Sequence, residues 1–272
     1  MNSIRWRRDM DLQMRGKRFL VVGGTAGIGL AAASVLAAEG ACIAVIGRNQ
    51  QRLDEAVEHL CVGATSEVFG VRGDVSTHAG ALDAVNRAVE FLGGLNGVAI
   101  TTGLIGHEPI GISDARWVEV FSDVFMGTVR AVEACLPYLV STQGSIVTTA
   151  AYSIRAPEIA RLPYASMKSA VATFTKGIAK AYGQEGVRAN CVAPGAIETA
   201  SLTALRRHVS ETKGIPYNEA LERVMVDEWH LDIALQRPGR ATEVGNLIAF
   251  VLSDLAAYMT GTLINIDGGT NF

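Results

Sequence analysis

The chain has 272 residues and a net charge of −3, and 49% of its residues are apolar while 19% are charged. This composition is typical of a globular protein with a large core, and the length fits one α/β domain. Because the 4 cysteines and 5 histidines are scattered and no basic field exists, the sequence argues against nucleic-acid binding, a disulfide framework and a metal site. No stretch approaches the roughly 18 uninterrupted apolar residues of a membrane span.

Residues 1–16 precede the first predicted strand and form an expected N-terminal extension. They carry Arg5, Arg7 and Arg8 but lack the continuous apolar stretch of a signal peptide. We expect a solvated arm or an arm that clasps another subunit. Together with cysteines placed as buried free thiols, this predicts a reducing, cytoplasmic location.

From residue 17 onward, short β-branched runs alternate with Ala-rich amphipathic stretches, the pattern of parallel βαβ units. Strands are predicted at 18–22, 42–46, 67–71, 97–101, 145–149, 187–192 and 263–266. Helices are predicted at 28–39, 50–60, 78–92, 114–139, 164–183 and 242–253. Crossovers of this length predict a single-domain Rossmann fold, with a doubly wound, seven-stranded parallel sheet.

Residues 198–237 interrupt this alternation and are predicted to form a helical substrate lid over the ligand crevice. Apolar residues recur there at near-helical spacing, at Leu202, Leu205, Tyr217, Leu221, Met225 and Trp229. Such a face either covers the crevice or packs elsewhere, because periodicity does not say what a face touches.

A glycine-rich turn joins the first strand to the first helix, with the sequence Gly23-Gly24-Thr25-Ala26-Gly27-Ile28-Gly29. Glycines let the backbone turn tightly and approach a pyrophosphate, which then lies against the positive N-terminus of the helix. Farther along, Tyr164 and Lys168 lie one helical turn apart, so their side chains project from one face. A neighbouring ammonium favours phenolate and is expected to lower the pKa of the tyrosine.

With these two features in this order, the chain resembles the short-chain dehydrogenase/reductase family from residue 17 to its end. The resemblance implies a dinucleotide-binding domain at 17–272, with the lid at about 198–237. It also implies that Tyr164 protonates a substrate carbonyl as hydride leaves nicotinamide, and that Lys168 also holds the nicotinamide ribose. Further cofactor contacts implied by family motifs are Asp74, Val75, Thr102, Gly103, Pro194, Gly195, Ile197 and Thr199.

In this family the residues after the second strand select the cofactor, and here they are Arg48 and Asn49. A guanidinium suits the 2′-phosphate of NADP, and no carboxylate competes, so NADP(H) is predicted over NAD. The alternative is that Arg48 is a solvated surface residue.

Two positions depart from the family pattern. Ala151 stands where the family has a carbonyl-polarising Ser, and Val124 stands where it has an Asn of the proton relay. We expect Ser153 to replace the missing hydroxyl, with Thr149 as the alternative. Losing one donor at such a site lowers turnover by ~10²–10³ rather than abolishing it.

Three loop residues are further candidates on the substrate side. His107 is a possible auxiliary acid or base, and Arg155 and Glu158 either grip a polar substrate group or pair with each other.

The leading function is an NADP(H)-dependent carbonyl reductase or alcohol dehydrogenase for an apolar or cyclic small-molecule substrate. One alternative is a non-redox isomerase or dehydratase that uses Tyr164 as acid or base. Another is a nucleotide-sensing protein without turnover. The resemblance also implies a homotetramer or dimer, formed through the helices at 114–139 and 164–183.

Overall fold

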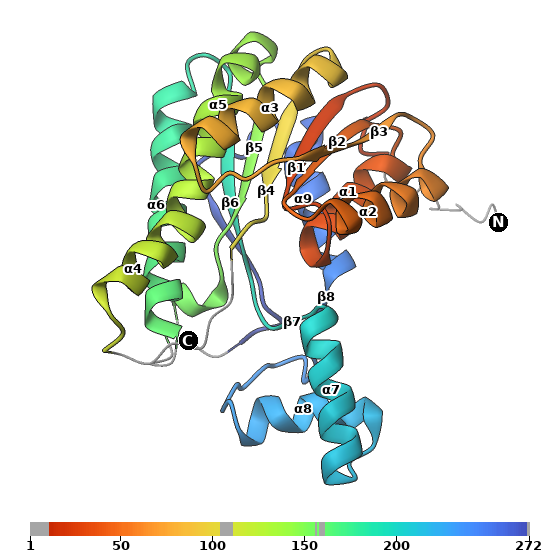
Figure 1. The fold of residues 1–272 in the computed structure, drawn as a ribbon, viewed down its shortest axis with the longest axis vertical. Helices are drawn as coiled ribbons and strands as arrows, with labels where there is room; N and C mark the ends of the chain where they lie inside the picture. Colours follow the sequence, from red (N-terminus) through yellow and green to blue (C-terminus); the bar gives the residue numbers. More distant parts are fainter. Residues whose placement is uncertain (1–10, 104–110, 156, 158–160, 271–272) are drawn as a thin grey trace, which may run out of the picture.

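One parallel sheet organises the chain in the computed structural model, which describes residues 11–103, 111–155, 157 and 161–270 (Figure 1). Its seven strands follow the order β3-β2-β1-β4-β5-β6-β9. Their bounds are β1 Arg18–Val22, β2 Cys42–Gly47, β3 Val68–Arg72, β4 Gly97–Ile100, β5 Ser145–Thr149, β6 Arg188–Pro194 and β9 Leu263–Ile266. The predicted Rossmann sheet is confirmed, and its strand order reverses between β1 and β4, where ligands bind in such sheets.

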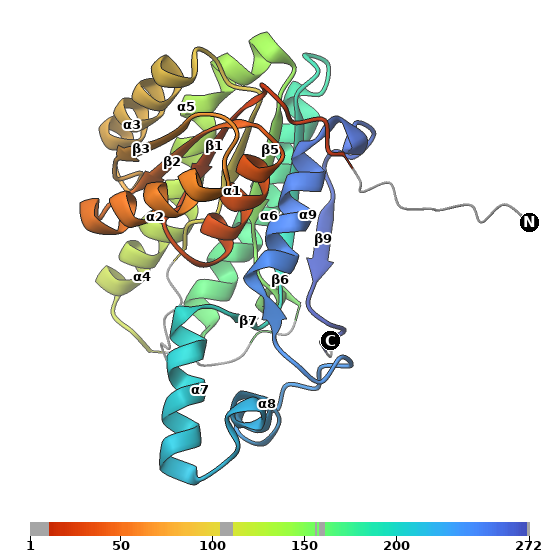
Figure 2. The ribbon, with the colours of Figure 1, turned by 90° about the vertical axis from the view of Figure 1, so that its right-hand side faces the viewer.

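Helices cover both faces of the sheet (Figures 1 and 2). On one face lie α1 Gly27–Ala38, α2 Gln50–Gly63 and α9 Ala241–Leu252, and on the other α3 His78–Leu92, α5 Gly127–Thr142 and α6 Leu162–Tyr182. Each layer has its own apolar core, exemplified by Leu36 and Ile248 on the first face and by Val85 and Val132 on the second. Strands buried on both faces explain the continuous apolar runs in the sequence.

The helix predicted at 114–139 contains a wide turn. It consists of α4 Asp114–Val120, a π-helical turn η1 at Phe121–Met126 and then α5. The run Asp114–Thr142 is long and apolar enough to cross a membrane by length and composition, but 50% of the apolar window is buried inside the fold. Val132, Cys135 and Leu139 pack fully buried in the core, so this is a core helix by its contacts.

Residues 198–237, the lid segment, extend beyond the carboxyl ends of the strands (Figure 1). They contain α7 Ala200–Lys213 and α8 Tyr217–Asp227. The chain enters through β7 Ile197–Glu198 and leaves through β8 Gly239–Arg240, and these two short strands pair in parallel. The lid segment is therefore held at both of its ends.

A buried arginine binds the parts of the lid segment together. Arg206 is 5% exposed, and it donates hydrogen bonds to the carboxylates of Glu198 at 2.8 Å and Glu222 at 2.7 Å. The C-terminal turn adds backbone bonds, from Ala234 N to Gly269 O at 3.2 Å and from Leu235 N to Gly268 O at 3.0 Å.

Not every apolar lid residue faces the crevice. Leu221 and Met225 are buried in a cluster that also contains Tyr152 from outside the lid segment. Tyr217 is 48% exposed, and its ring centroid lies 5.6 Å from Cζ of Arg206. Of the two alternatives left open for this apolar face, Tyr217 follows the second, because its ring packs against the buried Arg206.

The described part of the N-terminal extension packs on the domain. Leu12 and Met14 are buried in the core cluster that contains Leu36, and Leu12 N donates to the Glu39 carboxylate at 3.1 Å. The arginines predicted to form an arm, Arg5, Arg7 and Arg8, lie outside the described residues.

Candidate functional site

The glycine-rich turn lies where β1 ends and α1 begins. Gly23 and Gly27 have φ values of +85° and +54°, which L side chains rarely adopt. Gly29 permits a close approach, because a Cβ there would lie 2.3 Å from Gly23 O. Ala26 precedes α1 in an extended conformation, so the free N–H groups of the helix N-terminus open toward the turn.

Beside this turn lies a cavity of about 270 Å³. The predicted cofactor residues that line it are Gly23, Thr25, Arg48, Asn49, Asp74, Val75, Thr102 and Gly103. Two of these polar side chains also make local bonds: Asn49 Oδ1 accepts from Arg52 N at 3.0 Å, and Asp74 Oδ1 accepts from Ser76 N at 2.9 Å. Arg52 lines the same cavity, which the sequence analysis missed.

A second cavity, of about 370 Å³, adjoins the first and shares Thr102 and Gly103 with it. The other predicted residues that line it are Ile28, Ser153, Tyr164, Lys168, Pro194, Gly195, Ile197 and Thr199. The two cavities therefore bring together every predicted catalytic and cofactor-binding residue except Ala26, Gly27 and Gly29, which shape the turn between β1 and α1. We call the larger of these two the catalytic cavity.

Lys168 is held at the carboxyl ends of two strands. Its side chain is 2% exposed, and Nζ donates to Thr149 O at 2.8 Å and to Thr102 O at 3.0 Å. Burial lowers the pKa of Lys168 to about 8, although the nearby Cys191 thiol acts in the opposite direction. Gly103 has a φ of +143°, which L side chains rarely adopt, and a Cβ there would lie 2.7 Å from Nζ, so glycine lets the backbone lie close to this ammonium.

Tyr164 lies one helical turn before Lys168, with the ammonium 5.6 Å from its ring centroid. Burial raises the pKa of the phenol to about 12, and the charge of Arg161 only partly offsets this. The expectation of a lowered phenol pKa is therefore wrong here, because desolvation outweighs the charge of Arg161. The phenol stays protonated at neutral pH, which suits a proton donor.

Ser153 lines the catalytic cavity from a short 3-10 helix, η2 Tyr152–Ile154. It is 1% exposed, and its buried Oγ has no hydrogen-bond partner among the described residues, as is also true of Thr102 Oγ1. The alternative donor, Thr149 Oγ1, is engaged with Ile100 O at 3.1 Å. A buried hydroxyl without a partner is costly unless a ligand satisfies it, so these contacts favour Ser153 over Thr149.

Other sequence candidates have different places. Arg155 forms an ion pair with Asp267 of the C-terminal turn, while His107 and Glu158 lie outside the described residues. Val124 is buried at 1% exposure in η1, so its side chain offers no polar group to a proton relay.

The lid segment and the start of α6 supply the rest of the wall of the catalytic cavity. Leu202, Leu205 and Trp229, which the sequence places in the lid, line it together with Leu231. Arg161 and Tyr152 also line it and were missed, although Arg161 lies three residues before Tyr164 at the start of the same helix. A spacing of three residues places two side chains on the same face of a helix, so the sequence itself held a signal that Arg161 lies near Tyr164.

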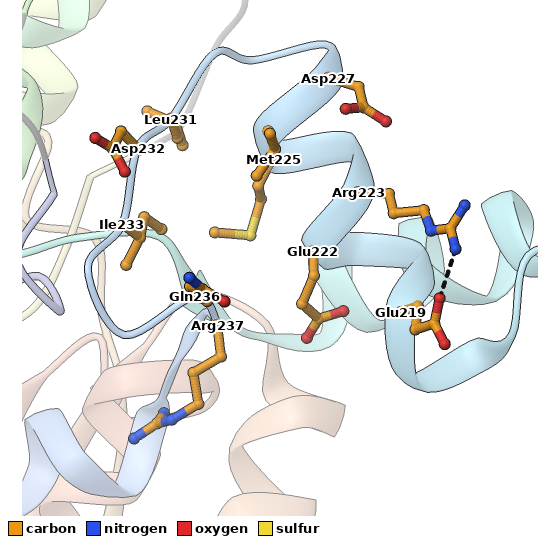
Figure 3. Close-up of a pocket in the computed structure, with 11 residues that line it drawn as sticks. Glu219, Glu222, Arg223, Met225, Asp227, Leu231, Asp232, Ile233, Gln236 and Arg237 are labelled. Atoms are coloured by element: carbon orange, nitrogen blue, oxygen red, sulfur yellow. Dashed lines mark hydrogen bonds and ion pairs between the residues drawn. The ribbon is translucent and has the colours of Figure 1, made fainter.

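A larger cavity, of about 470 Å³, lies between α8 and the following segment (Figure 3). Met225 extends across it toward Ile233, and Glu219 and Arg223 pair at its rim at 2.7 Å. None of the predicted catalytic or cofactor residues lines it, so the chemistry belongs to the catalytic cavity. Among the described residues, no group of three or more His, Cys, Asp or Glu is placed to hold a metal ion.

Known proteins resemble the chain over nearly its whole length. A family model described as enoyl-(acyl carrier protein) reductase matches residues 23–271. The 3-oxoacyl-(acyl-carrier-protein) reductase FabG of Chlamydia pneumoniae is 28% identical over 265 residues, covering 97% of this chain and all 100% of that protein. Isoepoxydon dehydrogenase patN of Aspergillus clavatus is 30% identical over 264 residues, covering 94% and 95%. L-sorbose reductase from Gluconobacter frateurii, complexed with NADPH and L-sorbose, superposes with a TM-score of 0.89 at 27% identity, covering 96% and 98%.

Proposed function

Since the chain belongs to the short-chain dehydrogenase/reductase family and is an NAD(P)-dependent oxidoreductase, we propose that it is an NADP(H)-dependent carbonyl reductase. In the opposite direction it oxidises the matching secondary alcohol. One observation carries this proposal: Tyr164, Lys168 and the Ser153 hydroxyl, which has no partner among the described residues, line one cavity, and this cavity shares Thr102 and Gly103 with the cavity beside the glycine-rich turn.

Two features of the residues present fit a nicotinamide dinucleotide. The glycine-rich turn lines the cavity of about 270 Å³ through Gly23 and Thr25, just before α1, where a pyrophosphate would lie against the N-terminus of that helix. The buried Thr102 Oγ1, which has no partner among the described residues, lies in both cavities and can bond to such a ligand. When bound, the nicotinamide supplies a hydride to the substrate carbon.

We propose NADP(H) rather than NAD as the cofactor because of two arginines that follow β2. Arg48 and Arg52 both line the cavity of about 270 Å³, and two guanidiniums bind a 2′-phosphate better than the bare ribose hydroxyls. The similar L-sorbose reductase was crystallised with NADPH, which supports this choice.

In the reduction, Tyr164 gives its proton to the carbonyl oxygen, and Ser153 donates a second hydrogen bond to that oxygen. The phenolate that remains is stabilised by the Lys168 ammonium, which the carbonyls of Thr149 and Thr102 hold in place. Leu202, Leu205 and Trp229 form an apolar wall of the cavity, so we assign an apolar or cyclic body to the substrate.

The test follows NADPH oxidation by its absorbance with a panel of ketones, together with the identity of each product. Reduction of a ketone with stoichiometric NADPH oxidation supports the proposal. A product without NADPH oxidation indicates an isomerase or dehydratase, which the apolar Ala151 and Val124 would suit. Tight NADPH binding without any product indicates a nucleotide sensor. Either of the last two results overturns the reductase.

We also propose that the chain assembles as a homotetramer or dimer through α4–α5 and α6. Val118 on α4 is 64% exposed and Phe121 on η1 is 40% exposed, and apolar side chains left open on a helix are suited to a subunit interface. Sedimentation of the purified protein tests this, and a monomer at micromolar concentration would contradict it.

A further inference from the structure

The C-terminal turn lies beside the end of the lid segment as a short antiparallel pair. Ile233 forms an antiparallel bridge with Thr270, and Ala234 N donates to Gly269 O at 3.2 Å. Because this hydrogen bond joins neighbours of the bridged residues, Ile233 and Thr270 form a pair that shares no hydrogen bond of its own. The register and the direction of the pair are therefore defined up to Thr270, where the described residues end.

Continuing this register by two residues would place Asn271 opposite Asp232 and Phe272 opposite Leu231. Pairs with and without shared hydrogen bonds alternate along antiparallel strands, so the 231–272 pair would be of the same unbonded kind as the 233–270 pair. The N–H of Leu231 agrees with this, because it donates to Met225 O at 2.8 Å within the lid segment. Side chains lie closest in unbonded pairs, whose Cα atoms are about 4.5 Å apart.

The burial of the side chains fits the same register. Leu231 and Ile233 are buried, whereas Asp232 between them is exposed (Figure 3). The bridged partner of Ile233 is also buried. Because alternate residues of a strand share a face, Asn271 would fall on the exposed face and Phe272 on the buried one. The polar and the apolar residue of the sequence therefore match the two faces of the pair.

The buried face of this pair leads toward the catalytic cavity. Ile233 lines the cavity of about 470 Å³ beside α8, Leu231 lines both that cavity and the catalytic cavity, and Trp229 lines only the catalytic cavity. The antiparallel partner advances in the same order, from the residue opposite Ile233 to the residue opposite Leu231. Continued pairing would thus bring the Phe272 ring to the apolar edge of the catalytic cavity.

We propose that Phe272 pairs with Leu231 and completes the apolar wall of the catalytic cavity, where its ring limits the size of the ketone that the enzyme accepts. An aromatic ring against an aliphatic side chain is a stabilising cross-strand contact, and it fills space that a substrate would otherwise enter. This inference rests on the proposed reductase function, to which it adds a specificity-determining residue. Leu231 does not line the cavity of about 270 Å³, so NADPH binding should not depend on Phe272.

The first experiment compares the NADPH-dependent reduction of cyclohexanone with that of 4-phenylcyclohexanone, which carries one added phenyl group on the same ring ketone. Phe272→Ala should raise the ratio of kcat/KM for the larger ketone over the smaller by at least about tenfold, because the opened apolar wall can receive the added ring. Phe272→Leu should give an intermediate ratio. NADPH affinity should stay within a few-fold of wild type in both variants.

Leu235→Ala is the matched control, because Leu235 is an exposed apolar residue of the lid segment that does not line the catalytic cavity. Its ratio should equal that of the wild type. If Phe272→Ala also leaves the ratio unchanged while both ketones are reduced, the inference is overturned and the reductase function stands.

A second experiment tests the register without any turnover. It uses a Cys61→Ser background, because Cys61 is an exposed free thiol. Leu231→Cys together with Phe272→Cys should form a disulfide, since the Cα atoms of a directly opposite pair lie within the reach of one. Leu235→Cys together with Phe272→Cys, four residues out of register, should stay reduced. Thiol titration of the unfolded protein and non-reducing electrophoresis measure the two results.

If Leu231→Cys prevents folding, Asp232→Cys together with Asn271→Cys tests the same register from the exposed face. A disulfide within one chain supports the inference. Thiols that stay reduced, or a disulfide that joins two chains, overturn it. If neither ketone oxidises NADPH, the reductase proposal fails, and the cross-link alone then decides whether Phe272 lies against Leu231.

Discussion

The ammonium of Lys168 donates a 2.8 Å hydrogen bond to the carbonyl of Thr149, the last residue of β5. A second bond, to Thr102 O at 3.0 Å, fixes the same ammonium beside the end of β4. The position of the charge is thus set by two strand ends rather than by the helix alone. Removing it leaves two carbonyls without this donor, so a substitution at Lys168 disturbs more than one charge.

Tyr164→Phe deletes the phenolic proton and little else. We expect turnover to fall by roughly 10²–10⁴, the range for losing a general acid, with NADPH affinity within a few-fold of wild type. Lys168→Ala should lower both turnover and NADPH affinity. Steady-state kinetics and fluorescence titration of NADPH measure the two quantities. A Tyr164→Phe variant that keeps most of its activity would place the proton donor elsewhere, with His107 the first residue to test.

The pKa of about 8 for Lys168 predicts a pH dependence of ketone reduction. Below this value the ammonium is charged and stabilises the phenolate that Tyr164 becomes, and above it that charge is lost. The phenol itself stays protonated to a pKa of about 12, so the turnover number should be level near pH 7 and decline as pH rises through 8. A pH–rate profile at saturating NADPH tests this. A turnover number that increases through pH 8 is incompatible with this assignment.

Ser153 and Ala151 test which hydroxyl polarises the substrate. If Ser153 Oγ, which has no hydrogen-bond partner among the described residues, is the second donor, Ser153→Ala should lower turnover by roughly 10–10³-fold with little change in NADPH binding. Ala151→Ser should partly rescue that variant. If Ser153→Ala is silent and Ala151→Ser alone raises ketone reduction, the natural site lacks this donor and the non-redox alternatives gain support.

Arg48→Asp tests the choice of cofactor. A carboxylate repels the 2′-phosphate and accepts the free ribose hydroxyls, so preference should shift from NADP(H) toward NAD(H). Because Arg52 lines the same cavity, Arg52→Gln should weaken NADPH selectively and Arg48→Asp/Arg52→Gln should do so further. Specificity constants for both cofactors measure the shift. A wild type that already prefers NAD(H) would refute the role of these arginines.

The sheet and the glycine-rich turn could be predicted from the sequence because their signals are local. A buried parallel strand needs a continuous apolar run, and the turn before α1 needs glycine where φ is positive, as at Gly23. The π-helical turn Phe121–Met126 could not be predicted, since the apolar periodicity of a helix scarcely changes across one extra residue.

The missed site residues depend on packing between distant segments. Arg161 lies at the wall of the catalytic cavity in contact with Trp229, far along the chain, whereas Arg52 lies in the first turn of α2, four residues after Arg48, and lines the same cavity as Arg48. Burial also reversed the expected pKa shift of Tyr164. Desolvation is a property of the assembled fold, so no spacing of Tyr and Lys in the sequence reveals its size.

The pairing of β7 with β8 means that the lid segment leaves the Rossmann domain and returns to it at neighbouring points. A segment with adjacent ends can be lengthened, shortened or replaced by that of a relative with little effect on the sheet that carries it. The reason is that the β7–β8 pair already holds the two ends of the segment together. Grafting 199–238 as a cassette would therefore exchange the apolar wall of the catalytic cavity and leave Arg48, Tyr164 and Lys168 in place. In evolution, exchanges between the same two strands can change the substrate that the enzyme accepts while the residues that carry out the reaction stay the same.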